Sequence, residues 1–329
     1  MTIVAKKATD YSEWDDLIEN FRHDVFHTLE FNSAYAAEID AEPVLFKFYD
    51  GNDLIGLAPL LQRKIPHSNK FDLTSCYGYS GLLCSENDYG RILIYLETEF
   101  AANFPKYVTI FLRSNPFLTS SSGGTDVIYI DVANQGALVL DSYRYGHRSE
   151  IKKALPYASI REVESTKANI ETFYDIYLST MLRLNASKLH FFSKKFFDLL
   201  GSNNSFGCKI IFVYHDDRPV AGCIFLWKGW ISHYFLSGSN SNVGWLRPGK
   251  LLIHKCNEIA KNLNVDILSL GGGLAGADDS LSQFKRGFSK SLKKYNTHCI
   301  ISSVPAYEEL LKVDESLPES TFFPRYRSS

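Results

Sequence analysis

The stretch LSLGGGLAGADDSLSQFKRGFSK (268–290) decides between two kinds of enzyme fold. Three of its glycines, Gly271, Gly273 and Gly276, spell G-x-G-x-x-G directly after an apolar run, which is the spacing of a dinucleotide-binding loop. Such a loop requires a strand–helix–strand unit and an acidic residue about twenty residues beyond the glycines. Here the following segment, 285–294, carries five basic residues and no acidic one. We therefore reject the dinucleotide interpretation.

The residues just past the glycines carry more chemical information. Consecutive glycines at the end of a strand permit positive φ and let a ligand or another backbone come close. Phe284 and Phe288 then flank the cations Lys285 and Arg286. A cationic run of this kind can hold phosphate groups, and it is equally typical of a solvated basic face. The residues alone leave both interpretations open.

Composition excludes several broad classes of protein. The 329 residues suffice for one large or two medium domains, and 45% hydrophobic with 22% charged residues is typical of a globular chain. The net charge of −2 creates no overall field that attracts polyanions. The N-terminus lacks the apolar core of a signal peptide, and no apolar run reaches about eighteen residues. We therefore expect a cytoplasmic protein without a membrane span.

The six cysteines point to neither disulfides nor a metal site. None forms C-x-x-C, and no Cys/His cluster has the spacing of metal ligands. We expect reduced, mostly buried thiols and no bound metal.

The first part of the chain reads as a mixture of helices and strands. PVLFKFYDGNDLIGLAPLLQRK (43–64) predicts a hairpin, because two apolar runs flank the turn signal Asp-Gly-Asn-Asp. Apolar spacing predicts helices near 14–21, 32–39 and 89–102, and strands at 72–76, 107–112 and 126–131.

After Asp131 a second pattern begins. A basic helical segment, DSYRYGHRSEIKKAL (141–155), leads to a short strand, and two helices follow at about 168–184 and 193–200. Three strands in series come next, CKIIFVYH, PVAGCIFLW and WISHYFLSG, then a helix opened by Pro248, the strand VDILSL and a last strand HCIISSV. This order predicts an α+β protein with two domains, each a mixed, mostly antiparallel sheet flanked by helices.

Five segments, taken in order, resemble the FemABX family, which is built from tandem GCN5-related N-acetyltransferase (GNAT) domains. They are CYGYSGLL (76–83), RYGHRSEIKKAL (144–155), FYDIYLSTMLRLN (173–185), RPVAGCIFLWKGWISHYFLSGSN (218–240) and FKRGF (284–288). The resemblance implies an N-terminal GNAT-like domain at 1–143 and a C-terminal GNAT domain at 144–312 that binds the acyl donor. We expect the tail, 313–329, to pack on the first domain.

The resemblance implies acyl transfer to an amine. Members that build peptidoglycan cross-bridges take amino acids from aminoacyl-tRNA. Related bacterial proteins use acyl-CoA to acylate the amino group of a nucleotide-linked sugar for surface polysaccharide. The chain shows no Lys-rich coiled-coil arm, and its slightly acidic balance does not suit a tRNA backbone.

These points favour a sugar N-acyltransferase. We expect it to move an acyl group from acyl-CoA to a dTDP- or UDP-linked amino sugar, as in O-antigen or lipopolysaccharide biosynthesis of the cell envelope. The alternative is an aminoacyl-tRNA-dependent aminoacyltransferase acting on a peptidoglycan precursor, the only case with a nucleic-acid partner.

The donor site that the resemblance implies lies around 231–250. The strand ending in YFLSGS is expected to splay from its neighbour and leave backbone groups for the pantetheine of coenzyme A. The pyrophosphate is expected at the N-terminus of the next helix, where free N–H groups favour anions. The candidate donor-binding residues are Ser237, Gly238, Trp245, Arg247, Gly249 and Lys250. The segment WLRPGKLL departs from the GNAT pattern R/Q-x-x-G-x-G/A. Each of these residues is therefore a separate expectation and not a match to that pattern.

Three residues are candidates for the chemistry itself. The resemblance implies that Lys285 stabilises the negative charge that develops during transfer, and the same side chain could instead hold a phosphate. The acceptor amine must lose a proton, for which His233 and His147 are candidate bases. An amine can also lose its proton to water, with no protein base.

The acceptor is expected to bind elsewhere. Arg144, Arg148 and Lys152 follow at a spacing of four, which places them on one face of a helix. Cations on one face suit the diphosphate of a nucleotide sugar, and pairing with Glu150 or with solvent is the alternative. Tyr77 and Tyr79 could stack on a base or sugar, or serve as ordinary core or turn residues.

Overall fold

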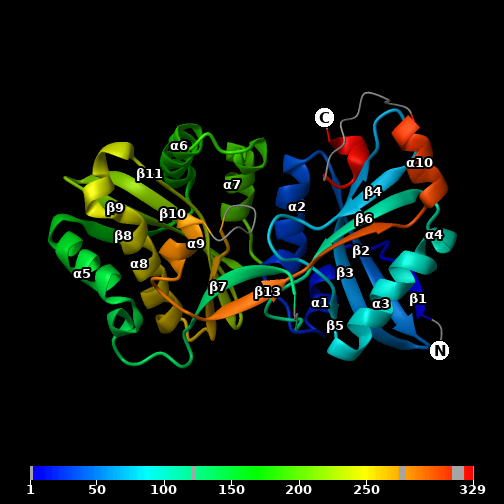
Figure 1. Ribbon diagram of the computed structural model, residues 1–329, viewed down its shortest axis with the longest axis horizontal. Coiled ribbons are helices and arrows are strands. Elements are labelled where there is room, and N and C mark those ends of the chain that lie inside the picture. Colours follow the sequence, from blue (N-terminus) through cyan, green and yellow to red (C-terminus); the bar gives the residue numbers. More distant parts are fainter. Residues whose placement is uncertain (1–2, 121–122, 274–278, 313–321, 329) are drawn as a thin grey trace. The chain divides into compact units, whose positions relative to one another are not determined.

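The structure is a computed structural model that describes residues 3–120, 123–273, 279–312 and 322–328 (Figure 1). The chain divides into two compact units. Unit 1 comprises 1–124 and 295–329, and unit 2 comprises 125–294. In each unit a mixed sheet is flanked by helices, which is the α+β architecture predicted from the sequence.

The sheet of unit 1 is built around a long hairpin. Its strands lie in the order β1 (Ile3–Lys7), β2 (Glu42–Asp50), β3 (Asp53–Lys64), β4 (Phe71–Thr74), β6 (Tyr107–Arg113) and β14 (Thr297–Ile301), with β5 (Leu83–Cys84) paired to β3. The predicted hairpin is confirmed: Asp50 lies opposite Asp53, and Gly51 turns the chain with φ +63°. The helices of this unit are α1 (Trp14–Ile18), α2 (Leu29–Glu38), α3 (Glu86–Thr98), α4 (Phe100–Asn103) and α10 (Val304–Lys312).

The sheet of unit 2 holds the three predicted strands in series at its centre. Its order is β13 (Leu292–Tyr295), β7 (Thr125–Asp131), β12 (Ile267–Gly271), β11 (Ile231–Ser239), β10 (Arg218–Lys228), β9 (Gly207–His215) and β8 (Ser159–Glu164). The helices are α5 (Tyr145–Ala154), α6 (Lys167–Arg183), α7 (Lys194–Gly201), α8 (Pro248–Asn262) and α9 (Ser280–Lys285).

The compact units follow strand pairing, whereas the domain limits 1–143 and 144–312 follow the restart of the sequence pattern. Strand β7 pairs with β12, so the chain enters unit 2 at residue 125. Strand β14 pairs with β6, which places 297–301 in unit 1. Most of the expected tail, 313–321 and residue 329, lies outside the described residues. Its described end contacts unit 1, where the hydroxyls of Tyr326 and Thr109 lie 2.8 Å apart.

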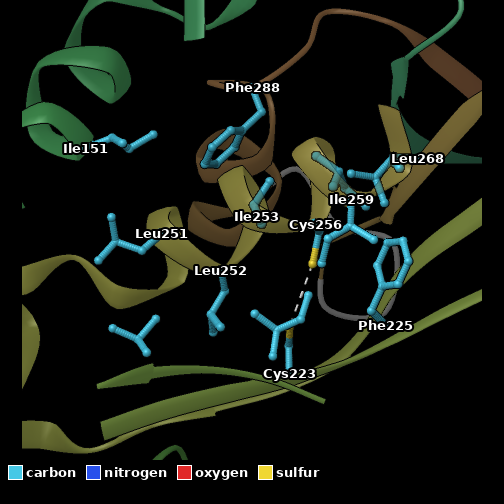
Figure 2. Packing of buried hydrophobic residues seen from close by; sticks show 14 of the residues in the cluster. Ile151, Cys223, Phe225, Leu251, Leu252, Ile253, Cys256, Ile259, Leu268 and Phe288 are labelled. Atoms are coloured by element: carbon cyan, nitrogen blue, oxygen red, sulfur yellow. Dashed lines mark hydrogen bonds between the residues drawn. The ribbon is translucent and has the colours of Figure 1, made fainter. Parts of the chain in front are cut away.

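Helix α8 is fixed by the core of unit 2. Figure 2 shows its apolar side chains, among them Leu252, Cys256 and Ile259, packed against strand residues that include Cys223 and Phe225. The thiols of Cys223 and Cys256 lie 3.7 Å apart, and both are fully buried. Each large apolar side chain buried in this way contributes about 1.5–3 kcal/mol to folding. The core therefore determines where the N-terminus of α8 lies.

Strands β11 and β12 are parallel, and they pair over three positions only. These are Ile231 with Ile267, Ser232 with Leu268, and His233 with Ser269. Beyond them β11 continues to Ser239 paired with β10, and β12 continues to Gly271 paired with β7. The divergence predicted for the strand ending in YFLSGS is thus confirmed, and it begins after His233.

Candidate functional site

Lys285 ends the short helix α9 and is buried, with 8% of its surface exposed. Its Nζ donates a 2.7 Å hydrogen bond to the carbonyl oxygen of Gly272, just past the C-terminal end of β12. Burial lowers the pKa of Lys285 from 10.5 to about 8, and the nearby Asp279 opposes that shift. Lys285 is therefore an ammonium group in a dry environment beyond the point where β11 and β12 part.

His147, in the first turns of α5, holds the segment that carries Lys285. Its Nε2 lies 2.9 Å from the carbonyl oxygen of Phe284, and the ring contacts the rings of Phe284 and Phe288 at 5.7 and 4.7 Å. A carbonyl oxygen only accepts, so Nε2 carries the hydrogen. Burial lowers the pKa of His147 below 6.5, which keeps the imidazole neutral at pH 7.

Gly287 completes this contact. A Cβ placed on it would lie 2.2 Å from Nε2 of His147, so only glycine leaves room for the ring. Its carbonyl oxygen also accepts a 2.9 Å hydrogen bond from the N–H of Arg144, the residue that precedes α5. The motif F-K-R-G-F is thus joined to the start of α5 at two points, Phe284 and Gly287.

A cavity of about 420 Å³ opens beside these contacts. It is formed by the start of α5, the end of β11, the start of α8 and Phe284, and its lining residues are Arg144, His147, Glu150, Ser239, Arg247, Pro248, Gly249, Lys250 and Phe284. We call it the α8 cavity. Among the donor-binding candidates, it brings together Arg247, Gly249 and Lys250.

The N-terminus of α8 faces this cavity without a side-chain cap. Arg247, the residue before the helix, adopts φ +50° and ψ +48°, and Pro248 occupies the first helical turn. The N–H groups at a helix start carry a partial positive charge and favour anions. The cations Arg144, Arg247 and Lys250 line the same space. The α8 cavity therefore suits phosphate oxygens.

One carboxylate moderates this charge. Glu150 of α5 accepts a hydrogen bond from Nζ of Lys250, and Nε of Arg247 lies 3.9 Å from it. The hydrogen bond from Lys250 is the main cause that lowers the pKa of Glu150, which therefore stays ionised at neutral pH. Glu150 joins α5 to α8 and occupies part of the cationic field that an anionic ligand would use.

The end of β11 is fixed by α6. The N–H of Ser239 donates to Oγ1 of Thr180 at 2.9 Å, and the hydroxyl donates in turn to the carbonyl oxygen of Ile176 at 2.8 Å. A Cβ on Gly238 would lie 2.8 Å from that same carbonyl oxygen. Gly238 is therefore required for close packing of α6, apart from any role in donor binding. Ser237 pairs with Cys223 of β10.

The three predicted acceptor cations do not meet in one cavity. Arg144 lines the α8 cavity, whereas Lys152 lines a second cavity of about 630 Å³ near the C-terminal half of α8. Arg148 points to Asp141, whose carboxylate lies 3.9 Å from its guanidinium. The three residues follow one another at a spacing of four along α5 and the residue before it. They nevertheless lie in different surroundings, because α8 and residues 137–141 pack against different parts of this face.

Two cations of the basic run after Lys285 share one acidic partner that the local sequence did not show. Asp126 of β7 accepts from Arg286 at 3.0 Å and from Lys294 at 2.7 Å. The hydrogen bond from Lys294 is the main cause that lowers the pKa of Asp126. Part of the run thus ties the chain beyond α9 to β7. Gly276 lies outside the described residues.

The other predicted residues lie in different surroundings. His233 is buried in β11 at the last position paired with β12. Tyr77 and Tyr79 belong to unit 1, where Tyr79 contacts Phe26 and Tyr295 at ring distances of 6.0 and 5.1 Å. Burial raises the pKa of both tyrosines. Trp245 lies in the 3₁₀ helix η5 (Ser241–Leu246), directly before α8.

Two kinds of feature are absent from the described residues. No group of three or more His, Cys, Asp or Glu side chains lies together as metal ligands would in 3–120, 123–273, 279–312 and 322–328. Within these same ranges, no helix has the length and apolarity needed to cross a membrane.

The chain is similar to known acyltransferases. Residues 141–286 match the family described as acetyltransferase (GNAT) domain, whereas no curated protein matches the chain. The solved structure of FemX is 12% identical with a TM-score of 0.69, and the match covers 94% of this chain and 99% of that one.

Two other solved structures cover nearly as much. A tandem GNAT protein from the clavulanic acid biosynthesis pathway is 10% identical, with a TM-score of 0.52 over 91% of this chain and 98% of that one. The C-terminal domain of a putative lysylphosphatidylglycerol synthetase from Agrobacterium fabrum is 9% identical, with a TM-score of 0.52 over 92% and 96%. The chain therefore contains a GNAT-type domain and has the fold of tandem GNAT-like domains.

Proposed function

We propose that the protein is an N-acyltransferase that moves an aminoacyl group from an aminoacyl-tRNA to a primary amine of a cell-envelope precursor. One observation carries the acyl transfer: the buried ammonium of Lys285 lies at the end of β12, beyond the parting of β11 and β12. An ammonium in a dry site stabilises a developing oxyanion far better than it would in water.

The chemistry needs few protein groups. The acceptor amine attacks the carbonyl carbon of the ester, a C–N bond forms, and the C–O bond to the donor breaks. The ribose oxygen of the tRNA leaves as a hydroxyl after it takes up a proton from water. Lys285 donates one N–H to Gly272, and within the described residues its ammonium makes no second hydrogen bond. We assign the remaining N–H groups to the oxyanion. The amine proton leaves to water or to His233, which lies where the two strands part.

The resemblance to the FemABX family supports the aminoacyl donor. The similarity to FemX spans nearly the whole chain, and a second structural neighbour is named as a lysylphosphatidylglycerol synthetase, an enzyme of aminoacyl transfer by its name. A second function rests on a different observation. GNAT domains typically bind acyl-CoA, and the α8 cavity, with Arg247, Lys250 and a helix N-terminus, suits a diphosphate. Coenzyme A carries a diphosphate and the 3′ end of tRNA does not, so an acyl-CoA-dependent sugar N-acyltransferase is the second candidate.

One experiment separates the two. Purified protein is incubated with charged tRNA or with acyl-CoA, each with a peptidoglycan precursor peptide and with dTDP- and UDP-linked amino sugars. Mass spectrometry of the acceptor and free thiol are the readouts. Acylation from charged tRNA is expected, and it should fall about 100-fold to 1,000-fold in Lys285→Met, the usual effect of losing an oxyanion-hole donor. Thiol release with an amino sugar would select the second function. Transfer that persists unchanged in Lys285→Met would contradict the role of this lysine.

A further inference from the structure

Two large aromatic side chains stand exposed next to the α8 cavity. Trp245 is 56% and Tyr157 61% exposed, and their ring centroids lie 5.9 Å apart at 72°. His215 approaches the same indole from another strand end, at 5.3 Å and 82°. Edge-on contacts of this kind hold a ring in place. Trp245 is thus both oriented by its neighbours and open to solvent.

The chain fixes this aromatic cluster at the rim of the α8 cavity. Trp245 stands two residues before Arg247, so their Cα atoms are at most about 7 Å apart. Tyr157 ends the 3₁₀ helix η3 (Leu155–Tyr157), which directly follows α5. The contact of Glu150 with Lys250 joins α5 to α8 between them. Trp245, which Tyr157 and His215 contact, therefore stands in the segment that leads directly into the α8 cavity.

A nucleotide site has two parts, a set of groups that bind phosphate and an aromatic ring that is held in a fixed orientation beside them. Cations and helix N–H groups hold the phosphate, and a flat ring stacks on the base. We infer that Trp245, supported by Tyr157 and His215, stacks the adenine of a phosphorylated adenosine at the end of the acyl donor. Coenzyme A and the 3′ end of aminoacyl-tRNA share this group. The inference rests on the proposed function, because it names the donor end of the same site.

Exposed tryptophan could also mark a surface for another protein, but the surroundings favour a nucleotide. The cavity next to Trp245 is lined by Arg144, Arg247 and Lys250 with Glu150 as the single carboxylate. An apolar protein partner would have to bury these charges, which is costly unless each is paired. A nucleotide leaves its phosphate on the cations and its base on the indole.

Equilibrium binding with the full chain tests the inference without any transfer reaction. The probes are adenosine 3′,5′-bisphosphate, which represents the end of coenzyme A, and cytidylyl-adenosine, which represents the end of tRNA. Inorganic pyrophosphate is the matched control, since it carries the charge but no base. Calorimetry gives the Kd, and quenching of tryptophan fluorescence reports contact with the indole. The other three tryptophans, Trp14, Trp227 and Trp230, remain as an internal reference.

Trp245→Ala is expected to raise the Kd of one adenosine probe about 10-fold to 100-fold, the usual worth of one stacked base. Trp245→Phe should restore most of the loss, and the Kd of pyrophosphate should not change in either variant. The probe whose binding depends on Trp245 identifies the donor. The inference would be overturned if Trp245→Ala raised the Kd of pyrophosphate and of the nucleotide equally, or if neither nucleotide bound the wild-type protein.

The result is separable from that of the proposed function. If a nucleotide binds in a Trp245-dependent way but no acyl transfer occurs, the base site is supported and the proposed function is rejected. If Trp245→Ala transfers the acyl group with an unchanged KM for the donor, the proposed function is supported and the base site is rejected.

Discussion

The Nζ of Lys285 and the carbonyl oxygen of Gly272 are joined by a 2.7 Å hydrogen bond. Gly272 directly follows β12 and Lys285 ends α9, so the bond fixes the ammonium to the end of β12. Gly272 has no room for a side chain, because a Cβ there would lie 2.7 Å from the carbonyl oxygen of Asp126. Gly272, which lies between two glycines of the dinucleotide-like motif, thus serves to place a lysine.

The pKa of about 8 for Lys285 predicts how transfer depends on pH. At pH 7 most of the lysine is ammonium, the form that stabilises an oxyanion. We expect the transfer rate from a saturating donor to fall as pH rises through about 8. In Lys285→Arg this fall should disappear, because the guanidinium stays charged. A rate that instead rises through pH 8 in the wild type but not in Lys285→Arg would show that the neutral amine of Lys285 acts as the base.

Lys285 also predicts a pH-dependent cost in stability. Its pKa in the folded protein is about 8, below the 10.5 of the unfolded chain. Below pH 8 the lysine is charged in both states, so the full cost of burying the charge is present. As pH rises from 8 to 10.5 the unfolded chain binds more protons, and this cost is relieved.

We therefore expect Lys285→Met to stabilise the protein at pH 7. The shift corresponds to roughly 3 kcal/mol, of which about 1 kcal/mol is offset by the lost hydrogen bond to Gly272. Urea denaturation at pH 7 and pH 10 measures the difference between variant and wild type, which should shrink at the higher pH. A variant that is less stable than wild type at pH 7 would contradict the argument.

Gly287→Ala should destabilise unit 2 by about 1–3 kcal/mol, the usual cost of overpacking. The new methyl group would meet the imidazole of His147 at 2.2 Å, and that ring also holds the carbonyl oxygen of Phe284. The transfer rate should fall together with stability, because Lys285 directly follows Phe284 in the chain. Gly146→Ala is the control on α5, since no atom lies within 4 Å of its Cβ position. It should be neutral or slightly stabilising, as alanine favours helices.

The sequence predicted those elements whose signals are local. The hairpin of β2 and β3 follows from its turn residues, and α8 begins at Pro248 as expected. Helix α3 begins at Glu86, three residues before the predicted start, because Ser85 caps it by accepting from the N–H of Asp88. The edge strand β1 was not predicted, since five residues with two lysines give little apolar pattern.

The site was predicted only in the parts that the family motifs mark. Lys285 and the start of α8 were named as candidates, and the structure places Lys285 at the end of β12 and the start of α8 in the wall of the α8 cavity. The partners that orient them were missed. Glu150 meets Lys250 across 100 residues, and Thr180 meets Ser239 across 59. Such pairs depend on how helices pack on the sheet, which no local spacing reveals.

Glu150→Gln should tighten the binding of anions in the α8 cavity. The change removes a negative charge that lies against Lys250 and Arg247, so both cations become available to phosphate oxygens. We expect the Kd of inorganic pyrophosphate to fall several-fold at low salt, and the gain to weaken as salt screens the charges. Lys250→Met should change the Kd in the opposite direction. Weaker binding in Glu150→Gln would mean that Glu150 acts mainly by positioning Lys250.

Thr180 predicts a matched pair of variants at the end of β11. Its hydroxyl accepts from the N–H of Ser239 at 2.9 Å and donates to the carbonyl oxygen of Ile176. Thr180→Val keeps the shape but leaves the N–H of Ser239 without this acceptor, at a cost of about 1–3 kcal/mol. Thr180→Ser keeps the hydroxyl and should lose less than the valine variant.

Because Ser239 lines the α8 cavity, the same pair also tests whether α6 supports donor binding. Thermal unfolding measures the stability of each variant, and calorimetry with inorganic pyrophosphate measures the cavity. We expect Thr180→Val to lower Tm and to raise the Kd of pyrophosphate, whereas Thr180→Ser should leave that Kd near the wild-type value. If the valine variant lowers Tm while the Kd stays unchanged, the contact of α6 with β11 stabilises the fold without shaping the cavity.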